Sequence, residues 1–166
     1  MNITIIFFLG LVIAFIGVIP PGLLNMTAAK VSLKEGFNRG VVFSIGVCVV
    51  VCLQTYIAAI FARYLSNHPD VIEILQRVAF VIFILITIYF FKSAQNQSKP
   101  KLDTYIKSKY RRFFKGMILS SLNVFPVPFQ AYMTITLASI GWMTFETISI
   151  MAYVAGAAMG TFIMLY

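Results

Sequence analysis

The chain has 166 residues, of which 60% are hydrophobic and 11% are charged. Soluble proteins are roughly 45–50% apolar, so the polar surface available here is too small to coat a soluble domain of this size. The net charge of +8 does not indicate a nucleic-acid partner, because eight of the 13 Lys and Arg residues fall in the stretch 92–115, between long apolar runs. The composition predicts an all-α polytopic membrane protein.

Five transmembrane helices are predicted, since a span needs about 20 mostly apolar residues. In chain order they cover residues of about 3–29, 40–61, 71–91, 116–140 and 147–166. Pro20-Pro21-Gly22 interrupts the first span, and Pro126 and Pro128 interrupt the fourth. The first twenty residues lack a basic start and a small-x-small cleavage site, so they are interpreted as a retained span and not as a signal peptide.

The distribution of Lys and Arg predicts the orientation of the spans. Three of these residues lie between the first two spans, two between the second and third, and eight between the third and fourth. An external N-terminus therefore places 11 on the cytoplasmic side and two outside, as the positive-inside rule requires. The basic stretch 92–112 is predicted to be a cytoplasmic linker that meets anionic lipid headgroups.

Two halves of the chain are related by a weak internal repeat. A shift of 105 residues places Pro21 on Pro126, Asn25 on Gln130 and Gly36 on Gly141. A unit of three spans enters the membrane from the opposite side when it is repeated, which predicts an inverted repeat. Residues 1–91 would form the first repeat and 113–166 an incomplete second one. The sixth helix would fall beyond the last residue, so we expect a longer parent reading frame or a partner that supplies the missing span.

The two interruptions are predicted to lie at the same membrane depth. Pro20 precedes Lys30 by ten residues and Pro126 follows Lys115 by 11, so both lie on the order of 15 Å from cytoplasmic charges, half of a hydrocarbon core about 30 Å thick. Irregular backbone at this depth needs protein or a water-lined cavity around it. Each following half-helix would present N–H groups that suit a carboxylate. Ordinary proline kinks in packed helices are the alternative.

The amides Asn25 and Gln130 are the leading candidates for binding a substrate. Each lies about one helical turn after its break, and an amide both donates and accepts hydrogen bonds, so the pair suits the ammonium and carboxylate of a zwitterion. Interhelical hydrogen bonding is the alternative role. Gln54, Thr55 and Tyr132 are weaker candidates. The predicted substrate-binding residues are Pro20, Pro21, Gly22, Asn25, Asn123, Pro126, Pro128 and Gln130.

No Asp, Glu, His, Lys or Arg stands deep in a predicted span. This disfavours a metal site, a catalytic acid–base pair and therefore an enzyme, and no cofactor is expected. Glu146 heads the fifth span, where it is interpreted as a helix cap, with proton coupling as the alternative. Gly156 and Gly160 predict close packing of that span against another helix. Cys48 and Cys52 are interpreted as buried thiols.

Short glycine and proline motifs carry a resemblance to a known family. They comprise Pro21-Gly22 in the first span, Gly36-Phe37-Asn38-Arg39-Gly40 and Gly46 at the second, and Phe114, Gly116, Leu122 and Asn123 after the basic stretch. With them the chain resembles the LysE/RhtB family of amino-acid exporters. The resemblance implies a secondary-active exporter of amino acids or related small metabolites in the cell inner membrane, driven by the proton motive force.

A second class of function remains open from the sequence. A membrane scaffold or assembly subunit without transport of its own is compatible with five spans. The expected partners are a small amino-acid-like molecule and the lipid bilayer, with a homo-oligomer as a further candidate.

Overall fold

The computed structural model describes residues 2–20, 22–68, 70–71 and 108–166, together with single residues and pairs between 74 and 91. The chain divides into two compact units, Met1–Arg63 with Ile106–Tyr166, and Tyr64–Tyr105. All packing described below belongs to the first unit. Most of the predicted third span lies outside the described residues. The helices with defined bounds are α1 (Ile3–Val18), α2 (Leu23–Glu35), α3 (Phe37–Ser66), α5 (Lys109–Leu122), α6 (Pro126–Ser139) and α7 (Thr147–Leu165).

Two helices in the described ranges, α3 and α7, are each long and apolar enough to cross a membrane. They correspond to the predicted second and fifth spans. The first predicted span appears as α1 and α2, which are bent by 84° and together make a third candidate span. The fourth is divided between α5 and α6, of 14 residues each. Of the five predicted spans, two or three are therefore supported by helix length and composition.

Several helix boundaries differ from those expected, and the two largest differences are at the end of α2 and the start of α5. The helix α2 continues past residue 29 to Glu35 and ends at Gly36, whose φ of 94° is a conformation that glycine adopts without steric cost. The helix α5 begins at Lys109, so the last four residues of the stretch 92–112 are helical. Both extensions lie beyond the apolar windows, because hydropathy marks the membrane-buried part of a helix and not its polar ends.

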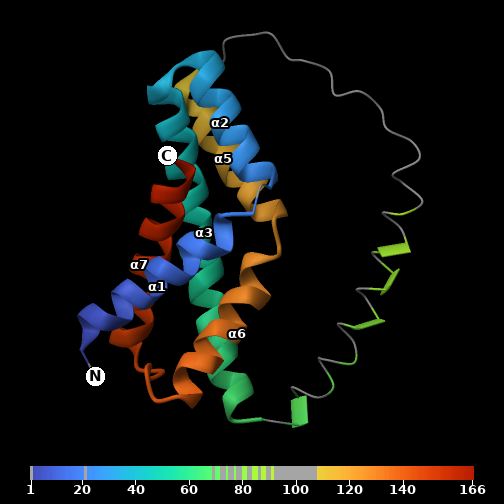
Figure 1. Ribbon diagram of the computed structural model, residues 1–166, viewed down its shortest axis with the longest axis vertical. Helices are drawn as coiled ribbons and strands as arrows, with labels where there is room; N and C mark the ends of the chain where they lie inside the picture. The colour runs from blue at the N-terminus through green and yellow to red at the C-terminus, as the bar shows by residue number, and fades with distance from the viewer. Residues whose placement is uncertain are drawn as a thin grey trace. The chain divides into compact units, whose positions relative to one another are not determined.

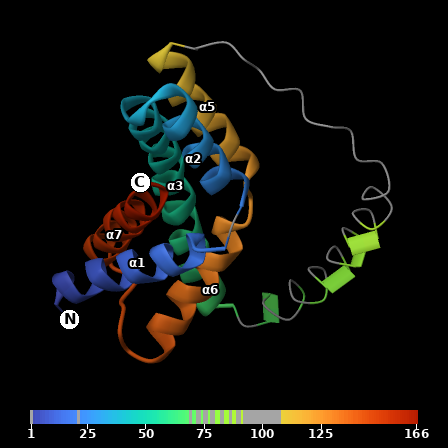
Figure 2. The ribbon, with the colours of Figure 1, turned by 45° about the horizontal axis from the view of Figure 1, so that its top comes forward.

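The helices α1 and α7 cross each other in close contact (Figures 1 and 2). A Cβ atom on Gly10 of α1 would collide with the backbone carbonyl of Tyr153. A Cβ on Gly156 of α7 would collide with the carbonyl of Phe7, and Gly160 meets the backbone of α1 in the same way. The predicted role of Gly156 and Gly160 in close packing is therefore confirmed.

The helices α3 and α5 meet through a second glycine contact. A Cβ on Gly46 of α3 would collide with the backbone carbonyl of Phe113, and a Cβ on Gly116 of α5 would collide with that of Phe43. In membranes, small residues favour helix association because they allow backbones to approach closely and gain van der Waals contact. The helix α3 therefore packs closely against α5, as α7 does against α1.

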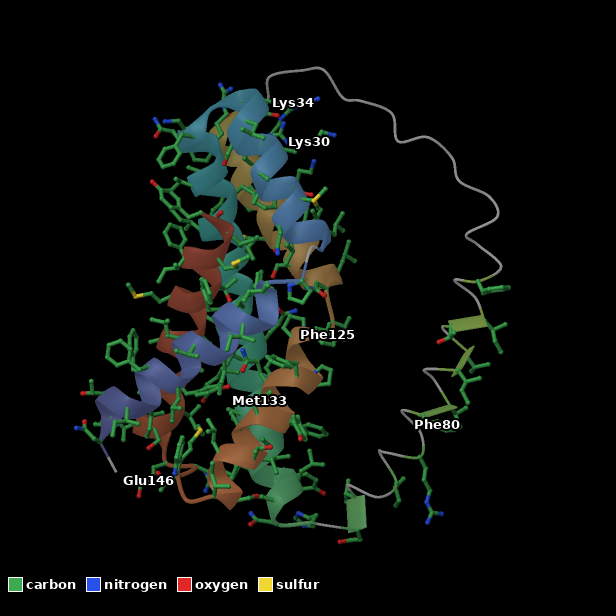
Figure 3. All side chains as sticks on the ribbon, in the orientation of Figure 1. Lys30, Lys34, Phe80, Phe125, Met133 and Glu146 are labelled. Carbon is green, nitrogen blue, oxygen red and sulfur yellow. The ribbon has the colours of Figure 1, made fainter. Side chains whose placement is uncertain are left out.

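Charged residues mark the two ends of the first unit. Figure 3 shows Lys30 and Lys34 on α2 at one end and Glu146, which precedes α7, at the other, with Phe125 between them. Buried apolar side chains of α2 and α3 fill the end near the lysines, whereas those of α1, α3, α6 and α7 fill the end near Glu146. The break between α5 and α6, marked by Phe125, therefore lies between the two polar ends (Figure 3).

Candidate functional site

A cavity of about 470 Å³ lies in the first unit, where the two interrupted helices meet. Its wall comes from the end of α1, the start of α2, the end of α5 and the start of α6, with further residues from α3 and α7. Six of the eight predicted substrate-binding residues line it: Pro20, Gly22, Asn25, Asn123, Pro126 and Gln130. The structure thus brings together residues from two segments that are about 100 positions apart.

The other predicted residues have different positions. Pro128 is exposed on the first turn of α6 and is not part of the cavity wall. Pro21 lies outside the described residues. Glu146 occupies the N-cap position of α7, but its exposed side chain makes no capping hydrogen bond and it does not line the cavity. Tyr132 is 65% exposed and also lies away from the wall.

At the first break, the side chain of Asn25 satisfies carbonyl groups at the end of α1. Its Nδ2 donates to the carbonyl oxygen of Val18 at 2.5 Å and to that of Pro20 at 3.3 Å. The last carbonyls of a helix have no partner within the helix, and leaving them unsatisfied inside a membrane protein is costly. Since Nδ2 is committed to these oxygens, the group that Asn25 has left for a ligand is the acceptor Oδ1.

At the second break, the side chain of Gln54 of α3 donates to the carbonyl groups at the end of α5. Its Nε2 donates to the carbonyl oxygen of Ser120 at 3.1 Å and to that of Asn123 at 2.9 Å. Gln54 is 9% exposed, so these bonds form away from water. Gln54 therefore stabilises the interrupted backbone, and it is not part of the cavity wall.

Replacing Gln54 with leucine is expected to destabilise the protein, because the Asn123 carbonyl loses the Gln54 donor at a cost of about 1–3 kcal/mol, whereas the Ser120 carbonyl still accepts from the Asn123 N–H. The temperature at which detergent-solubilised protein loses its monodisperse elution peak should fall. The matched control is Asn38→Leu, which replaces an exposed amide on the same helix and should have no effect. An unchanged temperature for Gln54→Leu would contradict this role.

Gln130 of α6 is held by a hydrogen bond from α7. The Tyr153 hydroxyl donates to Gln130 Oε1 at 2.6 Å, and the two residues are 0% and 3% exposed. The buried hydroxyl needs an acceptor, which fixes Oε1 toward Tyr153. The Nε2 group, with its two N–H donors, has no partner within the described ranges, and Gln130 lines the cavity. Gln130 therefore offers donors to a ligand.

The two breaks differ in their backbone donors. Gly22, at the N-cap of α2, has no side chain that could accept from the N–H groups of the first turn. These N–H groups therefore stay available at the end of α2 that borders the cavity. Pro126 and Pro128 in the first turn of α6 have no N–H group. The start of α2 is therefore better suited to an anionic group than the start of α6, which is a difference that the sequence prediction did not make.

Tyr153 is the site residue that the sequence analysis missed. It precedes Gly156 by three residues and Gly160 by seven, so all three lie on one face of α7. That spacing was the available signal, since the same glycines predicted a packed face. Among the described residues, no group of three or more His, Cys, Asp or Glu side chains could hold a metal ion.

Comparison with known proteins adds one match. The family model of the LysE type translocator matches residues 4–166. Neither among curated proteins nor among solved structures was a match found.

Proposed function

Since the chain belongs to the LysE type translocators, we propose that it is a secondary-active exporter of amino acids or related small metabolites. The family implies transport across a membrane, and the apolar helices α3 and α7 fit a membrane location. The observation that carries the proposal is the cavity, because residues from both broken helices line it. Transporter sites of this kind lie between discontinuous helices near the midplane of the bilayer.

An inverted repeat is part of the proposal, and the glycine contacts support it. The contact of Gly10 with Tyr153 in α1 and α7 has a counterpart in the contact of Gly116 with Phe43 in α5 and α3. Gly10 and Gly116 are 106 positions apart, and Phe43 and Tyr153 are 110 apart. The first helix of each half thus packs against the third helix element of the other half. Such symmetry allows one half to rock against the other around a fixed site.

The orientation of the chain follows from its charges. We place the N-terminus outside the cell inner membrane and the basic stretch 92–112 in the cytoplasm, as the distribution of Lys and Arg predicts. The end of the first unit that carries Lys30 and Lys34 (Figure 3) is then the cytoplasmic end. Substrate would enter the cavity from this end and leave near Glu146.

The polarity of the cavity suits a zwitterion. Gln130 Nε2 and the first turn of α2 offer donors to a carboxylate, whereas Asn25 Oδ1 offers an acceptor to an ammonium group. The two charged groups of an α-amino acid are attached to the same carbon, so both fit within a cavity of about 470 Å³. We therefore propose that the carboxylate binds Gln130 Nε2 and the N–H groups at the start of α2, and that the ammonium group binds Asn25 Oδ1.

Replacing Gln130 with leucine is expected to abolish export, because the cavity loses its side-chain donors while the volume changes little. The measurement is the accumulation of a panel of amino acids in cells that produce the wild-type protein, the variant, or neither. Tyr132→Phe, on the exposed face of the same helix, is the matched control and should export normally. If the variant exports like the wild-type protein, Gln130 does not bind substrate. If the wild-type protein changes no accumulation, the scaffold hypothesis is favoured instead.

A further inference from the structure

A buried ion pair joins α2 and α5 at the end opposite to the cavity. Arg112 Nε donates to Glu35 Oε2 at 2.6 Å, and Arg112 Nη2 donates to Glu35 Oε1. The side chains are 5% and 13% exposed, respectively. The stretch 92–112 was predicted to be a linker that meets anionic lipid headgroups, and the burial of Arg112 corrects that prediction for this residue. The bidentate geometry is the strong form of an arginine–carboxylate contact.

The surroundings of the pair are cationic. Arg39 Nη1 donates to the backbone carbonyl of Glu35 at 3.2 Å, and exposed Lys34 precedes the glutamate. Glu35 is the only acidic residue in α2 and α5. On these two helices Arg112 therefore has no acidic partner other than Glu35, and the contact between the two is specific.

The two helices that the pair joins both lead to the cavity. Leu23, at the other end of α2, and Leu122, at the other end of α5, line its wall. With about 1.5 Å of rise per residue, the pair lies roughly 15–18 Å from these ends. Figures 1 and 2 show α2 and α5 side by side along this distance. Separating their charged ends would open a path from that end of the unit to the cavity.

We propose that the Glu35–Arg112 ion pair is the cytoplasmic gate of the cavity and that this structure is the state in which the gate is closed. The inference rests on the proposed transport through the cavity. Closing the gate removes both charges from water, and the bidentate contact offsets the lost hydration. Opening it returns both charges to water. The two states are therefore close in energy, whereas a state with one charge buried alone is not accessible.

The test measures access to the cavity from the cytoplasmic side. Thr161 lines the cavity and is 2% exposed, so Thr161→Cys, in a chain with Cys48→Ala and Cys52→Ala, provides a reporter thiol of nearly the same size. A charged maleimide that does not cross membranes is added to inside-out vesicles. Glu35→Gln should increase the labelling rate about tenfold, because Arg112 loses its buried partner. Lys34→Gln, which removes an exposed charge from the same turn, should leave the rate unchanged.

Exchange of the two charges provides the specific control. Glu35→Arg combined with Arg112→Glu should restore slow labelling, whereas each of these changes alone should accelerate it. The proposal would be overturned if the reporter chain is labelled at the same rate with and without Glu35→Gln, provided that both proteins are correctly inserted and monodisperse. This readout does not depend on the substrate, so a failure of the gate is distinguishable from a failure of the exporter function.

A locked variant tests the gate if Glu35→Gln does not fold. In the chain with Cys48→Ala and Cys52→Ala, the changes Glu35→Cys and Arg112→Cys introduce two thiols that a short bifunctional maleimide joins. Cross-linking should block amino-acid export by more than about tenfold relative to the same variant without the reagent, since the closed state cannot open. Cross-linked protein that still exports would show that the pair is only a structural brace and would overturn the proposal.

Discussion

Gln130→Glu is expected to stop export of carboxylate-bearing substrates and to allow export of the corresponding decarboxylated amines. Glutamate retains an oxygen that can accept from the Tyr153 hydroxyl, which lies 2.6 Å from Gln130 Oε1. It replaces the two N–H donors of Nε2 with a carboxylate oxygen that faces the cavity. Two like charges about 4 Å apart repel by about 4 kcal/mol at the effective dielectric constant of a protein, so export of the amino acid should fall at least about 100-fold.

The experiment compares an amino acid with its own amine. Efflux of both compounds is measured from preloaded cells that carry the wild-type protein, Gln130→Glu or Gln130→Leu. Leucine should lose export of the amino acid without gaining export of the amine, because it adds no negative charge. If Gln130→Glu exports the amino acid as the wild-type protein does, the carboxylate does not bind at this side chain.

Tyr153→Phe tests the same role of Gln130 in binding, with a smaller expected effect. The amide of Gln130 remains but is free to rotate, so its donors are no longer directed toward the cavity. The loss corresponds to one hydrogen bond, about 1 kcal/mol, and should raise the substrate concentration for half-maximal export several-fold with little effect on the maximal rate. A positioning role therefore differs in its kinetics from the direct contact made by Gln130.

The part of the site that the sequence predicted depends on local signals. Proline removes a backbone donor wherever it occurs in a helix, so Pro20 and Pro126 mark the breaks without knowledge of the fold. An amide one turn later, as at Asn25 and Gln130, is then near the break in any packing. These residues line the cavity because the fold brings the two breaks together, which the local signals did not show.

The contacts that the sequence did not predict join distant segments. Glu35 and Arg112 are 77 positions apart, and Gln54 bonds to carbonyls 66 and 69 positions away. Nothing local distinguishes Arg112 from Arg111 beside it, since both belong to the same basic stretch 92–112. Only the packing of α5 against α3 and α2 determines which of the two is buried. Hydropathy likewise identified the apolar centre of α2 but not its polar end.

Gly156→Ala is expected to destabilise the protein although alanine is the better helix former. In an exposed helix this change stabilises by about 1 kcal/mol. Here the added Cβ would collide with the backbone carbonyl of Phe7, which cannot rotate away as a side chain can. The helices α1 and α7 must then separate, at a cost of about 1–3 kcal/mol for overpacking and more where close contacts are lost. The expected readout is a lower temperature of aggregation in detergent.

The adjacent Ala155 gives the matched control, because it lies on the exposed side of α7. Ala155→Leu adds a larger side chain than Gly156→Ala and should leave the aggregation temperature nearly unchanged. Under the proposed inverted repeat, Gly46→Ala in α3 should lower it by an amount similar to Gly156→Ala, because its Cβ would meet the Phe113 carbonyl in the equivalent contact. If Gly156→Ala raises the temperature, helix propensity outweighs packing and the two helices have room to separate. If only one glycine matters, the two contacts are not equivalent and the symmetry between the halves loses its support.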